Sequence, residues 1–242
     1  MKRGFIFVVA LLWWAGMGAR AEEKESTKGW ERSLALGVTT TAGNKDSLLF
    51  TGSVVGQRAW EKDDWRLGAE GAYGKVEDSV STAKARLFGQ YKRLFTERWY
   101  GTLLLEGLHD SVADITYRIT TAVGLGYYFI KSDRTKLSAD IGPAFVYEKQ
   151  ESETGEGHAG VRLGERLDRK LSDSAKCWQS LEVVPQVNEW DNFTALFEVG
   201  VEAALTKDFS VRLVGQDQYD NQPSAGKKRN DVTVIGSLVY KF

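Results

Sequence analysis

Cysteine, histidine and proline are scarce in this chain. Its 242 residues include one cysteine, Cys177, two histidines, His109 and His158, and three prolines. A single thiol cannot close an internal disulfide, so a disulfide framework is excluded. So few imidazole and thiolate groups also argue against a transition-metal site, and we expect no cofactor. Few prolines and many strand-favouring residues indicate an all-β chain.

An excess of charge of either sign is also missing. Lysine and arginine together number 32 and aspartate and glutamate 33, so the formal net charge is -1. A protein that binds nucleic acid carries a basic patch or a clear positive balance. The charge balance therefore predicts no nucleic-acid partner.

Only the first segment of the chain has a sustained apolar run. "MKRGFIFVVALLWWAGMGARA" begins with two positive charges, continues with an apolar run up to about Trp14, and ends in an A-x-A pattern at Ala21. The run is shorter than the roughly 20 residues that a membrane-spanning helix needs. We therefore expect a signal peptide at residues 1–21, cleaved before Glu22, and a single exported domain at residues 22–242.

The rest of the chain alternates between apolar and polar residues. In "ITYRITTAVGLGYYFI" at residues 115–130, for example, the first, third, fifth and later odd positions are mostly apolar, and smaller or polar residues lie between them. Alternation sends the two sets to opposite faces of a sheet. The pattern predicts about twelve strands, most of them longer than the 5–6 residues usual in soluble sheets. The expected strands are 30–42, 47–60, 65–75, 82–95, 99–109, 115–130, 135–148, 158–170, 176–187, 193–205, 209–219 and 231–242.

The connections between these strands alternate in length. Short polar turns such as "EKDD", "TER" and "KSDR" take turns with segments that include "HDSVADI", "KQESETGEG" and "DNQPSAGKKRN". Outer-membrane barrels have short periplasmic turns and longer outer loops. An even number of strands places the N-terminus and the C-terminus on the same side of the membrane. Cleavage of the signal peptide would leave the N-terminus in the periplasm, so we expect both termini there. These features predict a single antiparallel transmembrane β-barrel of about twelve strands.

Aromatic residues cluster beside the short turns, which favours a barrel over a soluble β-sandwich. Such barrels have aromatic girdles at both membrane interfaces. The predicted periplasmic girdle comprises Trp60, Trp65, Phe95, Trp99, Phe129, Phe209, Tyr240 and Phe242. Three charged residues fall on the expected lipid face. Arg58 and Arg93 can reach the interface, whereas Glu165 lies deeper, and a bulge or a register error near it would explain its position.

Three stretches together resemble a known family. They are "TAGNKDSLLFTGS", the segment from Asp110 to "GLGYYF", and the final "QYDNQPSAGKKRNDVTVIGSLVYKF". They look like the YdiY-like family of putative salt-induced outer-membrane proteins, whose function is unknown. The resemblance implies an outer-membrane barrel in the cell envelope of a Gram-negative bacterium. It implies no catalytic residue and no established activity.

The residues expected to face the interior are strongly charged and mixed in sign. Two interpretations stay open: the charges line a water-filled path and tune its selectivity, or they pair across the interior and close it. The balance of signs favours a narrow or occluded lumen, and a barrel of twelve strands permits either. The lumen-lining candidates are Arg66, Glu70, Arg86, Arg118, Asp140, Arg162, Glu182, Glu198, Glu202 and Arg212. We expect a non-enzymatic envelope protein, either a narrow pore or a component of the salt or osmotic stress response.

A hydrolase at the outer rim is the alternative. It would need a histidine beside a nucleophile or a water molecule. His109, Asp110 and Ser111 are adjacent at the end of one expected strand, and His158 opens another at the same rim. Neighbouring residues of a strand point to opposite faces, however, so His109 and Asp110 are poorly placed to bond each other.

The remaining expectations concern partners in the membrane. The acidic loop "KQESETGEG" could hold a divalent cation between lipopolysaccharide phosphates, and "GKKRN" could contact those phosphates directly, although solvated loops explain both stretches. The last strand, with Val232, Val234, Gly236 and Leu238 toward lipid, should pair with the first strand near Trp30 to remove both edges. Its terminal aromatic residue, Phe242, resembles the signal that the outer-membrane assembly machinery reads.

Overall fold

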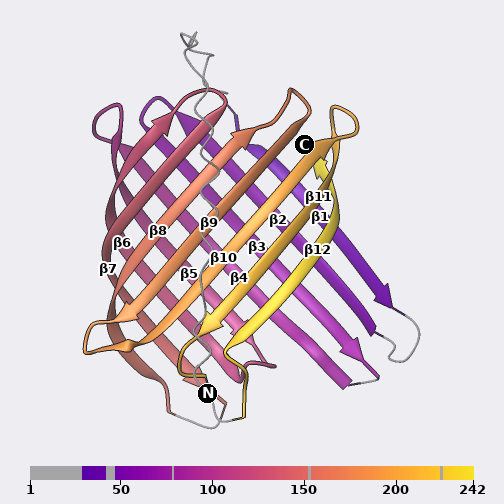
Figure 1. The fold of residues 1–242 in the computed structure, drawn as a ribbon, viewed down its shortest axis with the longest axis vertical. Coiled ribbons are helices and arrows are strands. Elements are labelled where there is room, and N and C mark those ends of the chain that lie inside the picture. Colours follow the sequence, from indigo (N-terminus) through magenta and orange to yellow (C-terminus); the bar gives the residue numbers. More distant parts are fainter. Residues whose placement is uncertain (1–28, 42–46, 78, 152–153, 224–225) are drawn as a thin grey trace, which may run out of the picture.

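A computed structural model describes residues 29–41, 47–77, 79–151, 154–223 and 226–242 of the chain. The expected signal peptide lies outside the described residues. The described residues form a closed antiparallel barrel (Figure 1). Its strands are β1 (Glu31–Thr41), β2 (Ser47–Trp60), β3 (Asp63–Val76), β4 (Ser79–Leu94), β5 (Trp99–Asp110), β6 (Ile115–Lys131), β7 (Thr135–Gln150), β8 (Glu156–Lys170), β9 (Ala175–Gln186), β10 (Glu189–Ala204), β11 (Phe209–Asp220) and β12 (Asn230–Lys241).

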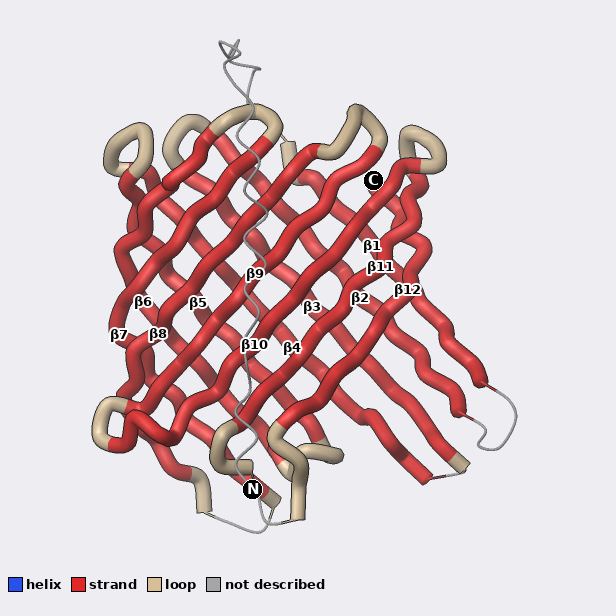
Figure 2. The backbone as a smooth tube through the Cα atoms, viewed as in Figure 1, coloured by secondary structure: helices blue, strands red, loops and turns tan. Residues whose placement is uncertain are grey.

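The predicted fold class is confirmed. Each strand pairs with its neighbours in the chain, and β12 returns to pair with β1. Figure 2 shows strands and short connections throughout the described part of the chain. No helix among the described residues is long and apolar enough to cross a membrane. The strand boundaries agree with the expected ranges to within a few residues, because the period-two pattern runs almost to the turns.

The short turns and the C-terminus lie at one end of the barrel (Figure 1). The backbone N–H of Phe242 donates to the carbonyl oxygen of Arg32, and that of Lys241 donates to Asp208 in the turn between β10 and β11. The end that carries the short turns is called the turn end below, and the opposite end, with the longer connections, the loop end. In the orientation usual for such barrels, the turn end faces the periplasm.

The two faces of the wall differ as the alternation predicts. Along β3, exposed Trp65 and Leu67 alternate with the less exposed Arg66 and Glu70, which line the interior. An outward apolar face and an inward polar face are what a bilayer requires of a barrel. The apolar residues exposed on this wall are therefore lipid-facing, and the interior is where polar chemistry can occur.

The expected irregularity around Glu165 is absent. The β7–β8 ladder runs without a register shift, and Ala139 pairs with Glu165. Glu165 keeps its outward position, where its carboxylate accepts a hydrogen bond of 3.4 Å from the side chain of Gln179 on β9. A polar pair near the turn end, rather than a bulge, thus accommodates this carboxylate. Arg58 and Arg93 also have partners near that end: Arg58 lies 4.9 Å from the ring centroid of Trp60, and Arg93 lies 3.6 Å from Asp63.

The seam between the first and last strands is much shorter than the other ladders. β1 and β12 share four residue pairs, from Ser33–Lys241 to Leu36–Leu238. On their other sides, β1 shares eleven pairs with β2, and β12 shares eleven with β11. The closure predicted for the last strand is therefore present at the turn end. Toward the loop end the two strands separate, which Figures 1 and 2 show as a wedge between β1 and β12.

Candidate functional site in the barrel interior

One cavity of about 660 Å³ occupies the interior. Its lining begins at Asp133 and Arg134 in the turn between β6 and β7, and it reaches Gln150 and Gln222 at the loop end. The lining thus extends along the whole barrel. All the predicted lumen residues line this cavity except Asp140 and Arg162, which face the interior but are buried beneath its surface.

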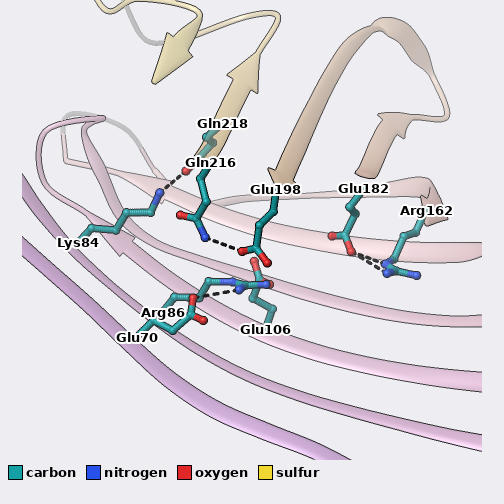
Figure 3. A network of polar contacts seen from close by, with 9 residues as sticks. All are labelled: Glu70, Lys84, Arg86, Glu106, Arg162, Glu182, Glu198, Gln216 and Gln218. Carbon is teal, nitrogen blue, oxygen red and sulfur yellow. Dashed lines mark hydrogen bonds and ion pairs between the residues drawn. The ribbon is translucent and has the colours of Figure 1, made fainter. Parts of the chain in front are cut away.

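Arginines on the wall lie between carboxylates of the flanking strands. Arg86 on β4 contacts Glu106 on β5 at 2.5 Å and Glu70 on β3 at 3.2 Å (Figure 3). Arg162 on β8 contacts Glu182 on β9 at 2.7 Å and also pairs with Asp140 on β7. The planar guanidinium has several donors and can serve two carboxylates at once. Each group neutralises charge within the wall itself.

Most of these pairs therefore run along the wall rather than across the interior. Two contacts do join distant strands. Arg118 on β6 lies 3.3 Å from Asp220 on β11 and also pairs with Glu148, and Lys84 on β4 donates to Gln218 on β11. Both lie toward the loop end, and Figure 3 shows the second. The interior is bridged at that level and remains lined by wall-bound pairs elsewhere.

A single carboxylate gathers three cations at the turn end. Glu202 on β10 is 2% exposed, and its oxygens lie 2.7 Å from Arg212, 2.7 Å from Lys241 and 3.6 Å from Lys176. Lys241 belongs to the last strand. Because a buried carboxylate is stable only with such compensation, this cluster ties β12 to β9, β10 and β11.

Three aromatic rings in the interior lie flat on the wall over glycines. Phe88 faces Gly68, Tyr100 faces Gly126 and Trp178 faces Gly200, and each pair is directly opposite in its ladder. A Cβ on any of these glycines would fall between 2.1 and 2.3 Å from the ring. Glycine opposite an aromatic residue is a recognised way to seat a ring on a sheet. The rings therefore stay against the wall and leave the centre of the lumen open.

The sequence interpretation did not include these rings among the lumen candidates. The signal was present for Phe88 and Trp178, which lie an even number of residues from the interior candidates Arg86 and Glu182 on the same strands. A cation accompanies each ring: Arg86 lies 4.8 Å from the Phe88 centroid, Lys92 4.9 Å from that of Tyr100, and Arg212 5.7 Å from that of Trp178. Cation–π contacts of this kind hold long basic side chains near the wall.

Two predicted lumen residues stay outside the ion pairs. Glu198 accepts hydrogen bonds from Trp178 at 2.6 Å and from Gln216 at 2.8 Å. Arg66 lies 5.5 Å from the Phe88 centroid and has no ion-pair partner within 4 Å among the described residues. These two opposite charges are consequently available to solutes in the lumen.

On the side of the cavity formed by β12, β1 and β2, several lining side chains are short and uncharged. Ser33 and Ala35 on β1, Thr51 and Ser53 on β2, and Ser237 on β12 line the cavity there. Short side chains leave more space than arginine and glutamate do. The cavity is therefore bordered by uncharged side chains along β12, β1 and β2.

The two histidines are not brought together. His109 lies on the outward face, exposed, and its Nδ1 is 2.8 Å from the carbonyl oxygen of Thr116. Asp110 instead accepts backbone N–H bonds from Val112 and Ala113 in its own turn. His158 lines the lumen. The arrangement of an acid and a histidine that a rim hydrolase would need is not assembled among these residues.

The loop-end stretches have partners of their own. Glu148, which directly precedes the acidic segment, pairs with Arg118, and residues 152–153 of the segment lie outside the described part of the chain. In the described part, no group of histidine, cysteine and acidic residues could hold a metal ion. Lys227 of "GKKRN" donates to the carbonyl oxygen of Val112 at 2.6 Å, which links the last loop to the connection between β5 and β6.

The aromatic residues assigned to the periplasmic girdle are all exposed on the wall near the turn end. Trp99 is 51% exposed, Phe95 58% and Phe242 57%. Tyr240 stacks between Phe209, at 5.1 Å, and Phe242, at 5.6 Å between centroids. Neighbouring rings thus form a continuous outward band across the seam side of the barrel.

Comparison with known proteins places the barrel among outer-membrane folds. A family model described as "Protein of unknown function, DUF481" matches residues 34–242. None of the curated proteins is significantly similar in sequence. The NanC porin is 7% identical with a TM-score of 0.52, and the match covers 88% of this chain and 98% of the porin. The translocator domain of the autotransporter NalP from Neisseria meningitidis is 13% identical (TM-score 0.50, 89% of each chain). An outer membrane channel from Pseudomonas putida F1 is 10% identical (TM-score 0.50, 93% and 100%). Likeness at such identity concerns the fold alone.

Proposed function

The chain belongs to the DUF481 family of proteins of unknown function, and on that premise we propose that it is a narrow, non-enzymatic channel of the outer membrane. The solutes would be ions and small polar molecules. The observation that carries the proposal is the interior cavity, whose lining reaches from the turn end to the loop end. The outward apolar wall and the fold of outer-membrane barrels support the location.

The size of the cavity limits what could pass. Spread over the roughly 30 Å of a bilayer's hydrocarbon core, its volume gives a mean cross-section of about 20 Å² for the centres of water-sized solutes. This corresponds to a path of two or three water molecules. The bridges Arg118–Asp220 and Lys84–Gln218 narrow it further near the loop end. Monosaccharide-sized and smaller solutes fit this path, and oligosaccharides do not.

The charges in the lumen support weak selectivity. Most carboxylates are neutralised by wall-bound arginines, while Arg66 and Glu198 offer one charge of each sign. A ring of one sign would select strongly, and a balanced lumen does not. Passage of small ions and zwitterions suits a role in osmotic or salt stress, which the sequence resemblance implies and which remains a prediction.

Liposome swelling tests the proposal. Liposomes containing the refolded protein are expected to swell in isosmotic arabinose or glycine and to stay unchanged in a tetrasaccharide, whereas protein-free liposomes should be unchanged in all three. Swelling no faster than that of protein-free liposomes would refute the channel. The rival rim hydrolase predicts lipid or peptide turnover that His109→Ala or His158→Ala abolishes, and we expect no turnover in the wild-type protein.

A further inference from the structure

The separated seam leaves two strand edges without partners in the half of the barrel toward the loop end. Residues 37–41 of β1 and 230–237 of β12 pair with β2 and β11 on one side and, among the described residues, with no strand on the other. Unpaired backbone groups facing lipid are costly, and they are tolerated where they border a water-filled cavity. The interior cavity does reach this place, because Ile235 and Ser237 of β12 line it.

Two glycines mark where the strands part. A Cβ on Gly37 would lie 2.3 Å from the carbonyl oxygen of Gly236, so only glycine allows the approach there. A Cβ on Gly236, by contrast, would meet nothing within 4 Å. Because Gly236 has no side chain, the outward side of the gap is unfilled at this position. The last close contact between the two strands thus lies at these glycines.

The two borders of the gap differ in polarity. On the outward side lie Val38, Val232 and Val234, which are 61%, 71% and 60% exposed. On the inward side, the hydroxyl groups of Thr51 and Ser237 lie beside Gly37 and line the lumen together with Ile235. An apolar rim in front of a hydroxyl-lined cavity matches a molecule with an apolar tail and a polar head.

A shallow apolar groove leads away from this rim over the outward face of the barrel. Its volume is about 640 Å³, and it begins at Leu36 and Val38 beside the gap and continues past Phe50 and Tyr73. Small residues such as Ala85 form its floor. A groove of this shape can hold an acyl chain parallel to the wall.

We propose that the gap between β1 and β12 is a lateral portal, through which a single-chain amphiphile passes between the lumen and the outer leaflet of the membrane. The head group moves along the hydroxyl-lined side of the lumen, and the chain follows between Val38 and Val234. The narrow lumen excludes lipids with several acyl chains. This route is additional to the end-to-end path for small solutes.

Reaction of a cysteine behind the gap with a maleimide delivered from the membrane tests the portal. In a Cys177→Ser background, Ser237→Cys places a thiol in the lumen beside the seam, and Thr194→Cys on β10 is the matched control in the same cavity. Each variant, refolded into liposomes, is treated with N-dodecylmaleimide, and its rate is divided by the rate with a small water-soluble maleimide. The portal predicts a ratio at least tenfold higher for Ser237→Cys. Equal ratios would overturn it.

A disulfide across the gap gives a second test in the same background. Val38→Cys with Gly236→Cys extends the existing register by one outward-facing pair, and Leu36→Cys with Leu238→Cys is the control within the paired region. Both pairs are introduced without Ser237→Cys, because a third thiol could form the wrong disulfide. The readout is therefore the binding of 11-(dansylamino)undecanoic acid. We expect oxidation of the first pair to lower saturable binding at least tenfold, reversed by reductant, and oxidation of the control to leave it unchanged.

Three results would overturn the proposal: no saturable binding to the wild-type protein, unchanged binding after the gap is closed, or covalent dimers on oxidation of Val234→Cys. The last would assign the edge to a second copy of the chain. If the first pair does not oxidise, the maleimide ratio alone decides. Liposome swelling does not enter either test, so the portal and the channel can fail independently.

Discussion

The indole ring of Trp178 covers Gly200, its direct partner in the β9–β10 ladder, and its N–H donates to Glu198 at 2.6 Å. A Cβ at position 200 would lie 2.1 Å from the ring. The ring is therefore held against the wall by the absence of one side chain, and Glu198 is oriented by the ring. The glycine at position 200 thus determines how far the Trp178 ring extends into the lumen.

Replacing that glycine should narrow the lumen. Gly200→Ala is expected to push the ring inward and to break its bond to Glu198, which reduces conductance at least twofold and lowers the free energy of unfolding by about 1–3 kcal/mol, as overpacking does. Conductance and urea unfolding of the refolded protein measure the two effects. Gly107→Ala is the control, because a Cβ there would meet nothing within 4 Å. Equal behaviour of the two variants would contradict the packing argument.

We expect the arginines that pair with carboxylates on the wall to contribute to stability, and the unpaired Arg66 to contribute to ion selectivity. Arg86→Gln leaves Glu70 and Glu106 without their shared cation and should lower stability by about 2 kcal/mol, less than the roughly 3–5 kcal/mol of a fully buried pair because the groups are partly exposed. Arg66→Gln should leave stability nearly unchanged and shift the reversal potential in a salt gradient toward cation preference. If Arg66→Gln lowered the free energy of unfolding more than Arg86→Gln does, the assignment would be refuted.

The turn-end cluster should govern closure of the barrel. Glu202→Gln removes the charge that Arg212, Lys241 and Lys176 share, so we expect a loss of about 3 kcal/mol and a lower temperature for the heat-induced mobility shift on gels. Asp208→Asn, in the exposed turn after β10, serves as the control. If both variants shift at the wild-type temperature, Glu202 does not hold the last strand.

The terminal aromatic residue should matter for assembly more than for stability. Phe242 is 57% exposed and stacks on Tyr240, and its backbone N–H bonds Arg32. Phe242→Ala retains the backbone bond. We expect it to reduce the assembled fraction in cells severalfold while the protein refolded in vitro shows a near wild-type unfolding curve. Normal assembly would argue against recognition of this residue by the assembly machinery.

Much of the architecture follows from alternation, because alternation persists where strands are long and each face meets a uniform medium. It predicts the strands around residues 115–130 and the return of the last strand to the first. It does not reveal how far that return extends: the seam stops at Leu36–Leu238, just before the close approach of Gly37 to the Gly236 carbonyl. Alternation places Glu165 outward, but it does not reveal the hydrogen bond from Gln179 on the next strand that accommodates the carboxylate.

The interior, too, can be predicted from the sequence only in part. The sequence identifies which charges face inward, but it leaves open whether they pair across the lumen or along the wall. The diagonal offset between neighbouring strands decides this, as in Arg162, which reaches both Asp140 and Glu182 from the strand between them. Glycines opposite Phe88, Tyr100 and Trp178 become meaningful only once the register is known.

Single-channel recording of the refolded protein in planar bilayers tests the central claim, a water-filled path from end to end, most directly. We predict small, discrete openings with weak ion selectivity, whose conductance changes when Arg118 or Glu198 is neutralised as Arg118→Gln or Glu198→Gln. Arg118 bridges the lumen to Asp220, and Glu198 faces the cavity. A silent bilayer containing correctly folded protein, or openings that neither substitution alters, would contradict the account.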